Sequence, residues 1–277
     1  ERPYIGIFLA VTKRIGISFS QTLEFAAYLA TDLVRSLGVA LQDIGYSVDL
    51  VESTEPYVGK CIFLDICSLE DKHLRTLQTR GSGFIALETR PLELVCSTKP
   101  ASFRTLYLDT LRTADLIWTP FPKNISWLEG EGIQAIPMSI GHHESLETKL
   151  PLAEPIWDVL VLGWKSTLLS EVIDTLQANR FRVRLPTRQP FIFRDDAMRH
   201  STCSLVLPDS HNAMDFIAPS AICAGIYNYS PVVVLGESLP FGAAPLCDLL
   251  SFDRDWPSRF YQIVQNQDIL SIGEERL

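Results

Sequence analysis

The chain has 277 residues, of which 47% are hydrophobic and 21% charged, and its formal net charge is −9. This composition is that of a globular protein with a sizeable core, and it excludes a disordered chain and a bundle of membrane helices. The length fits two domains or one large α/β domain. An acidic molecule repels polyanions, so nucleic acid is a disfavoured partner unless basic residues gather in one groove, for which Lys13, Arg14, Lys99 and Arg104 are candidates.

Six cysteines are spread along the chain, and several lie inside apolar runs such as the one that begins at Cys61. No pair has the C-x-x-C spacing of a zinc knuckle or a redox motif, so we expect buried, reduced thiols, no metal site and a cytoplasmic protein. The alternative, a nucleophilic cysteine, has no histidine-bearing motif in its favour. No apolar run reaches the roughly 18 to 20 residues that a membrane span needs.

Short apolar runs alternate with amphipathic stretches, a pattern that builds parallel sheets covered by helices. In the first half we expect strands at 4–9, 47–51, 61–66, 84–87, 114–119 and 134–136. The helices expected between them are 31–45, 69–79, 103–113 and 124–130. Gly45 is placed to end the first of these helices, because glycine readily adopts the left-handed conformation that follows a helix.

The stretch 141–155 carries charges and two prolines without periodicity, and we expect it to link two halves. The alternation then restarts, with strands at 158–162, 182–185, 203–207 and 231–235 and helices at 167–179, 195–200, 219–227 and 256–266. The prediction is an α/β protein with an N-terminal Rossmann-like domain at 1–148 and a C-terminal one at 149–277. The last helix is a candidate to pack back on the first domain.

The order of these elements carries a resemblance to a known family. Asp158 to Gly163 and Cys203 to Pro208 read as strands, and a helix then leads to the strand that starts at Ser230-Pro231. In the first half, Gly38 to Leu50 reads as a helix that ends in glycine before a valine-containing strand, and Ala114 to Gly141 closes the domain. The chain thus resembles, over nearly its whole length, the GT-B glycosyltransferases, whose two Rossmann-like domains face each other across a cleft.

The resemblance implies an enzyme that transfers a sugar from a nucleotide-diphosphate sugar to an acceptor, without a metal ion or other cofactor. It also implies where the donor phosphates bind. At Gly163 a strand ends, and Lys165 and Ser166 precede a helix, so backbone N–H groups and an ammonium group could meet a diphosphate there. Asp215 and Ser220 lie in a stretch that resembles the loop and helix start beneath those phosphates. For Lys165 and Ser166 the alternative is an ordinary turn with a solvated lysine. For Asp215 and Ser220 the alternative is a plain capped helix.

The helix at 219–227 departs from the family pattern. The family commonly carries two glutamates there, the second of which binds the ribose hydroxyls, whereas 221–230 contains no carboxylate. Asp215 is the nearest substitute for the first glutamate. Either Tyr227 or Asn228 holds the ribose, or the donor site is altered or inactive.

Four further polar residues are candidates for chemistry. Glu88 and Arg90 follow the expected strand 84–87, where Glu88 could deprotonate an acceptor and Arg90 could clamp a phosphate; a local ion pair is the alternative. His143 lies in the expected linker, near the cleft, and is a candidate catalytic residue, unless the linker is merely polar. His211 follows the strand 203–207 in a polar loop, a place that often carries function, and is a candidate for the donor site.

Three functions remain open. The first is sugar transfer to an unidentified acceptor, which could be a glycan, a small molecule or a macromolecule. The second is a non-catalytic, GT-B-shaped binding or interaction subunit, which the missing glutamate favours. A more remote third is a sugar or nucleotide epimerase or hydrolase. No P-loop, G-x-S-x-G or H-E-x-x-H motif supports another class of enzyme.

Overall fold

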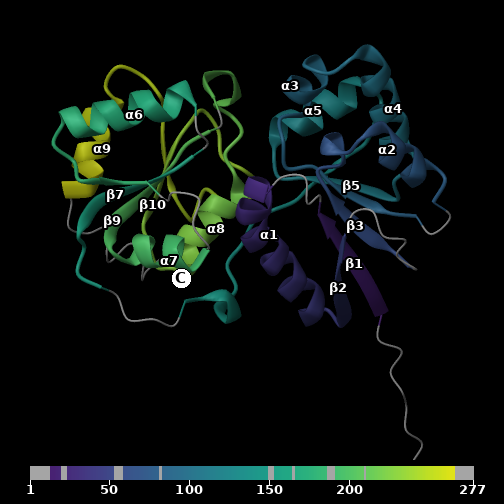
Figure 1. The fold of residues 1–277 in the computed structure, drawn as a ribbon, viewed down its shortest axis with the longest axis horizontal. Helices are drawn as coiled ribbons and strands as arrows, with labels where there is room; N and C mark the ends of the chain where they lie inside the picture. Colours follow the sequence, from purple (N-terminus) through teal and green to yellow (C-terminus); the bar gives the residue numbers. More distant parts are fainter. Residues whose placement is uncertain are drawn as a thin grey trace, which may run out of the picture.

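The computed structural model of the chain describes residues 13–19, 24–52, 59–80, 83–148, 153–163, 166–185, 191–208 and 210–265. It contains two parallel β-sheets with helices on both faces of each (Figure 1). We call the parts built on them the first lobe and the second lobe. The protein is therefore an α/β protein with two Rossmann-like units, as the sequence predicts. The expected strand 4–9 lies outside the described residues.

The first sheet has six parallel strands in the order β2-β1-β3-β4-β5-β6. They are β1 (Lys13–Phe19), β2 (Tyr46–Glu52), β3 (Cys61–Leu64), β4 (Ile85–Leu87), β5 (Leu116–Thr119) and β6 (Ile136–Pro137). Strand β1 was not expected, because the charged pair Lys13-Arg14 conceals the alternation in which Ile15 and Ile17 are buried. The strand order reverses at β1, which makes the carboxyl ends of β1 and β3 a topological switch point.

The helices of the first lobe divide between the two faces of this sheet. They are α1 (Glu24–Asp43), α2 (Asp71–Gln78), α3 (Leu92–Ser97), α4 (Ala101–Arg112) and α5 (Pro122–Gly130), with a short 3₁₀ helix, η1 (Ile66–Ser68). Leu33 and Leu41 of α1 pack on one face, against Ile17, while Phe84 and Tyr107 belong to the core on the other face. Gly45 has φ 89° and follows α1 as predicted.

The second sheet has five parallel strands in the order β11-β10-β9-β7-β8. They are β7 (Trp157–Leu162), β8 (Val183–Arg184), β9 (Ser201–Val206), β10 (Val232–Leu235) and β11 (Asp248–Leu250), the last of which was not expected. The helices are α6 (Thr167–Ala178), α7 (Phe191–Arg199), α8 (Pro219–Tyr227) and α9 (Trp256–Gln265), with 3₁₀ helices η2 (Glu144–Leu146) and η3 (His211–Ala213). Here the order reverses at β7, so the switch point lies between β7 and β9.

Helix α9 packs on the second sheet through Trp256 and Phe260, on the side of the molecule away from the first lobe (Figure 1). The last helix was a candidate to pack back on the first lobe, and α9 does not do so. The expected domain boundary at 148 falls between the two sheets, beside residues 149–152 that are outside the described ranges, and it stays a prediction. All six cysteines are buried, as expected.

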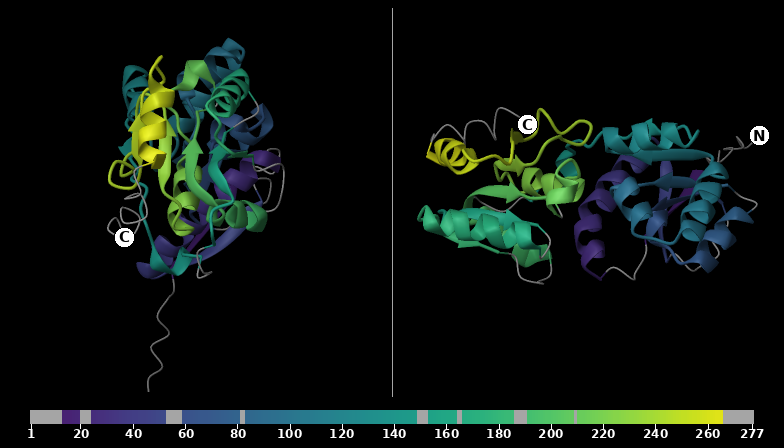
Figure 2. Two further views of the ribbon diagram at one scale, coloured as in Figure 1. Left: turned by 90° about the vertical axis from the view of Figure 1, so that its left-hand side faces the viewer. Right: turned by 90° about the horizontal axis from the view of Figure 1, so that it is seen from above.

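Helix α1 is a layer that both lobes share. Its Leu33 and Val34 pack on the first sheet, whereas Val39 packs against the core that α7 and α8 form with the second sheet. Figure 2 shows α1 between the two lobes. Ser36 hydroxyl oxygen lies 2.6 Å from the Tyr227 hydroxyl oxygen of α8. Although α1 has 20 residues, no helix in the described part of the chain combines the length and apolar character needed to cross a membrane.

A buried ion pair reinforces this junction. Arg194 of α7 donates from Nη1 to Oδ2 of Asp32 on α1 at 2.6 Å, and the two side chains are only 1% and 4% exposed. The same guanidinium also donates to Asp195 at 2.7 Å. Burial raises the pKa of Asp32, while the charge of Arg194 acts against this rise. Each lobe therefore supplies one half of a charge pair that is buried at the junction between the lobes.

Replacing Arg194 by methionine should lower the free energy of unfolding by about 3 to 5 kcal/mol, because Asp32 would stay buried without its cation. Arg112→Ala is the matched control, since Arg112 is exposed, pairs with Asp109 and should cost about 1 kcal/mol or less. Urea denaturation followed by circular dichroism measures both. Equal losses in the two variants would contradict the role given to the buried pair.

Candidate functional site

The carboxyl-terminal ends of the strands of both sheets meet along one seam. The backbone N–H of Phe241, after β10, donates to the Pro120 carbonyl after β5 at 2.9 Å, and the Phe241 carbonyl accepts from Ile140 N–H at 2.8 Å. Phe121, the residue after Pro120, packs its ring against that of Phe216 from the loop before α8, with centroids 5.0 Å apart. In open parallel sheets, ligands bind at this edge, and most often at the switch points. The candidate site is therefore expected at this edge.

At the switch point of the second sheet, Gly163 directly follows β7. A Cβ atom at this position would lie 3.0 Å from Cβ of Leu207, which follows β9, so glycine lets the two strand ends come close together. Ser166 then caps α6, its Oγ accepting from Leu169 N–H at 3.2 Å. The strand, the glycine and the helix are those that the sequence predicts, and the structure adds the cap by Ser166. Lys165 lies outside the described residues, so its phosphate contact stays a prediction.

The loop before α8 packs on the neighbouring strand end. The Met214 carbonyl accepts from Glu237 N–H at 2.9 Å, and a Cβ atom on Gly236 would lie 2.7 Å from that carbonyl oxygen. Helix α8 starts at Pro219, so Ser220, 4% exposed, is in its first turn. The first-turn N–H groups give this end of the helix a partial positive charge.

Sequence analysis missed Lys123, which the first lobe contributes to this region. Lys123 is near the start of α5, and its Nζ forms an ion pair with the carboxylate of Asp215 from the second lobe. The hydrogen bond with Asp215 raises the pKa of the Lys123 ammonium group. The signal was present in the sequence: the expected strand that ends at Thr119 is followed by Pro122, a residue favoured in the first turn of a helix. A strand end followed by the start of a helix, the pattern that indicated a site at Gly163, therefore also indicates one at Lys123.

The two candidate histidines occupy different places. His143 accepts from Ser145 N–H through Nδ1 at 3.2 Å and contacts Asp43 of α1 through Nε2 at 2.8 Å, so both ring nitrogens are engaged in joining the segment between the lobes to α1. His211 Nε2 lies 3.2 Å from Glu171, and its ring centroid is 5.4 Å from that of Phe252. His143 therefore has a structural partner on each side, and His211 is the more accessible of the two, with 44% of its side chain exposed.

The side chains offered as substitutes for the ribose-binding glutamate have other partners. The Tyr227 hydroxyl contacts Ser36 at 2.6 Å and the Gly141 carbonyl at 3.4 Å, both at the junction between the lobes. Asn228 is buried and donates to the Ala224 carbonyl at 2.8 Å. Both contacts argue against a role in holding ribose.

In the first lobe, a carboxylate is held at the end of β3. Asp65 adopts a left-handed conformation with φ 50°. Its Oδ1 accepts from Thr89 N–H at 2.6 Å and from the Thr89 hydroxyl at 2.9 Å. Arg90 Nε lies 3.9 Å from Oδ2 of the same carboxylate. Asp65 and Arg90 are thus brought together as an ion pair, and a local ion pair is the alternative considered for Arg90.

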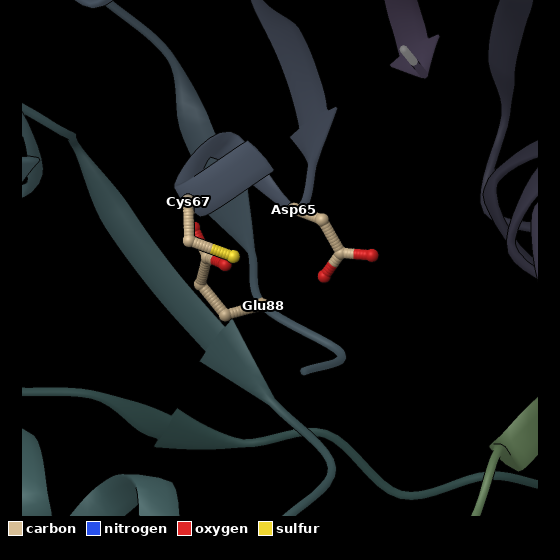
Figure 3. A group of neighbouring side chains, drawn as sticks. All are labelled: Asp65, Cys67 and Glu88. Atoms are coloured by element: carbon tan, nitrogen blue, oxygen red, sulfur yellow. The ribbon is translucent and has the colours of Figure 1, made fainter. Parts of the chain in front are cut away.

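Glu88 points away from this pair and into the lobe. Its side chain is fully buried, so it cannot touch a substrate in this structure, a placement that argues against the expected role as a base. It faces Cys67 (Figure 3), and burial, followed by the charge of Asp65, raises the pKa of Glu88 to about 8. At neutral pH, Glu88 therefore keeps its proton.

The raised pKa predicts the pH dependence of a variant. Below the ordinary carboxyl pKa of 4.5 both the folded and the unfolded chain are protonated, but between about 4.5 and 8 only the unfolded chain ionises, so wild-type stability falls as pH rises. Glu88→Gln lacks this loss. The difference in free energy of unfolding, Glu88→Gln minus metal-free wild type, should therefore increase between about pH 5 and about pH 8, by at least roughly 1 kcal/mol.

Chemical denaturation at several pH values measures this difference, and Glu129→Gln, at an exposed position of α5, is the control. The control should give a nearly constant difference. A constant difference for Glu88→Gln as well would show that Glu88 is ionised in the folded protein.

Comparison with known proteins places this geometry in a fold family. No protein-family model and no curated protein matches the sequence. The structure is similar to an α-glucosyltransferase in complex with UDP and a 13-mer DNA containing a central A:G mismatch, with a TM-score of 0.61 and 10% identity, covering 95% of this chain and 93% of that chain.

Two further solved structures have similar folds. One is AviGT4, a glycosyltransferase involved in avilamycin A biosynthesis, with a TM-score of 0.53 and 10% identity, covering 95% of this chain and 92% of that chain. The other is a putative UDP-N-acetylglucosamine 2-epimerase from Listeria monocytogenes, with a TM-score of 0.52 and 11% identity, covering 95% and 91%. At such identities the likeness shows the fold, and it confirms the predicted GT-B-like arrangement of two Rossmann-like units.

Proposed function

We propose that this protein transfers a sugar from a nucleotide-diphosphate sugar to an acceptor and binds the diphosphate at the seam, between the carboxyl ends of β7 and β9 and the start of α8. The observation that carries the proposal is the second switch point, where Gly163 and the capped start of α6 lie at the place where sheets of this type bind nucleotides. The similarity in fold to an α-glucosyltransferase solved with UDP supports it.

The charges at the seam suit a diphosphate. The first turn of α8 offers N–H groups and the positive end of a helix dipole, and Lys123 reaches the adjoining loop from the other lobe. In this structure Asp215 neutralises Lys123. A diphosphate carries more negative charge than one carboxylate and competes with Asp215 for the ammonium group. Lys165 supplies a second cation if its predicted position is correct.

This set of groups also provides what the chemistry needs. As the sugar leaves, negative charge builds up on the departing diphosphate, and cations and helix N-termini that are already in place stabilise that charge. These groups take the role that a magnesium ion has in other glycosyltransferases. We therefore expect transfer without added magnesium.

The acceptor binds, in this proposal, on the first-lobe side of the seam, where Asp65 and Arg90 follow β3 and β4. A glycan or small molecule fits the acidic chain better than nucleic acid does. Two of the four cations that could have made a basic groove are paired with carboxylates: Arg14, near the amino end of β1, with Asp49, and Arg104 with Glu131.

A non-catalytic binding subunit is the second candidate function. One observation favours it: α8 carries no carboxylate, and Tyr227 and Asn228, which could have replaced one, are engaged elsewhere. Such a protein would bind a nucleotide, or a partner, without transferring sugar.

A thermal-shift screen with uridine, guanosine and cytidine diphosphates tests the donor site. A nucleotide at roughly 100 times its Kd adds about 2.7 kcal/mol to the stability of the folded state, so the matching one should raise the Tm by several degrees. Lys123→Ala and Lys165→Ala should each reduce the shift. Lys72→Ala, an exposed lysine of α2, is the matched control and should not. A screen in which no nucleotide raises the Tm would contradict the proposed donor site.

Hydrolysis of the matching nucleotide sugar separates the two candidate functions. Many transferases slowly pass the sugar to water, so an active enzyme should release free nucleotide diphosphate from the nucleotide sugar, and Lys123→Ala should slow this release. Binding without any release, with either water or a panel of glycans and small-molecule acceptors present, would favour the binding subunit. Chromatographic detection of the nucleotide measures the reaction.

A further inference from the structure

A cluster of potential metal ligands lies beneath the carboxyl ends of β3 and β4, in the first lobe and apart from the proposed donor site. Asp65, Cys67 and Glu88 each offer one ligand atom, and these three atoms all lie within 4.8 Å of one another. Figure 3 shows that Cys67 and Glu88 point toward each other, with Asp65 on the side of the pair. Cys67 and Glu88 are buried, and Asp65 is partly exposed.

Part of this cluster lacks hydrogen-bond partners within the described part of the protein, whereas the carboxylate of Asp65 accepts from Thr89. Neither carboxylate oxygen of Glu88 has a hydrogen-bond partner there, and the buried hydroxyl of Tyr107, which faces Glu88, has none either. The Cys67 thiol, the Cys67 backbone N–H and the Tyr107 hydroxyl are close enough to the Glu88 carboxyl group to act against the rise in its pKa, but none forms a hydrogen bond of normal geometry with it. Buried polar groups in native proteins nearly always have partners, so three unpartnered oxygen atoms in one place indicate a missing ligand.

We propose that this cluster binds one divalent cation of borderline softness, of the type of Zn²⁺, through the Cys67 thiolate, a Glu88 carboxylate oxygen and an Asp65 carboxylate oxygen. One sulfur and two oxygen ligands suit such an ion. They do not suit Mg²⁺ or Ca²⁺, which bind oxygen ligands only. Zinc ligands in a tetrahedral site are about 3.5 Å apart, so the side chains must draw together by roughly 1 Å as the ion binds.

The charges of the site balance when the ion is present. Two carboxylates and a thiolate carry three negative charges, which one divalent ion and the guanidinium of Arg90, near Asp65, neutralise. Without the ion, burial keeps Cys67 and Glu88 protonated. Thr89 donates to Asp65 from its N–H and its hydroxyl, which orients that carboxylate as outer-shell partners of metal ligands do.

The ion would have a structural role. It would tie η1, which contains Cys67, to the end of β4, and so hold Asp65 and Arg90 at the edge of the sheet. The sequence does not reveal such a site, because its ligands come from separate strand ends and have no local metal-binding spacing. The expectation of metal-independent sugar transfer concerns the donor phosphates and is unaffected.

Cobalt(II) tests the site in the full chain, because a thiolate bound to it gives a charge-transfer band in the near ultraviolet. Chelator-treated protein titrated with Co²⁺ should bind one equivalent with this band, and Zn²⁺ should displace the cobalt. Cys67→Ser should abolish the band. Glu88→Gln should weaken cobalt binding by roughly tenfold or more. Cys203→Ser, a buried cysteine of β9 in the second lobe, is the matched control and should leave both unchanged.

Circular dichroism identifies variants that do not fold, and Glu88→Gln, which keeps the shape of the side chain, remains informative if Cys67→Ser is unfolded. Cobalt that binds without the thiolate band would overturn the proposal, as would a band that persists in folded Cys67→Ser. No binding at all would overturn it too, and would leave Glu88 as a buried neutral acid.

Discussion

The arrangement of the two lobes depends on the burial of Arg194 against Asp32. A guanidinium and a carboxylate lose their hydration when helices α1 and α7 pack, and each group gains a charged partner from the other lobe beside the one on its own helix, Asp195 for Arg194 and Arg35 for Asp32. This constraint fixes the position of α1, whose other face covers the first sheet. Because α1 is shared, the relation between the two carboxyl edges, and with it the seam where Lys123 meets Asp215, follows from the same contact.

Local patterns predicted much of the fold. Helix α8 runs from Pro219 to Tyr227 as expected, because Pro219 suits a first turn and the apolar run before the next strand is uninterrupted. Strand β1 was missed because its first two residues are charged, and β11 because three residues are too short to show a period. Parallel pairing followed from the alternation of strands and helices, whereas the order of the strands in each sheet was not predicted.

The candidate site was less predictable, because its properties arise from contacts between distant parts of the chain. A residue after a buried strand can face either outward, as Asp65 does, or inward, as Glu88 does, and the sequence around Glu88 does not distinguish the two. Likewise, the pairing of Lys123 with Asp215 joins residues from different lobes. The serine cap at 166 has a local structural reason, whereas the reason for the glycine at 163 is the close approach of Leu207 from another strand end.

Phe241 donates a backbone hydrogen bond to Pro120 and accepts one from Ile140. These bonds limit how far the seam can open for a substrate of the proposed reaction. Many two-domain enzymes open by bending at a hinge. Here such bending would have to break these main-chain bonds while the opposite side is held by α1. If the proposed function is correct, exchange of nucleotide would therefore depend on local motion of the side chains at this edge rather than on movement of a whole domain.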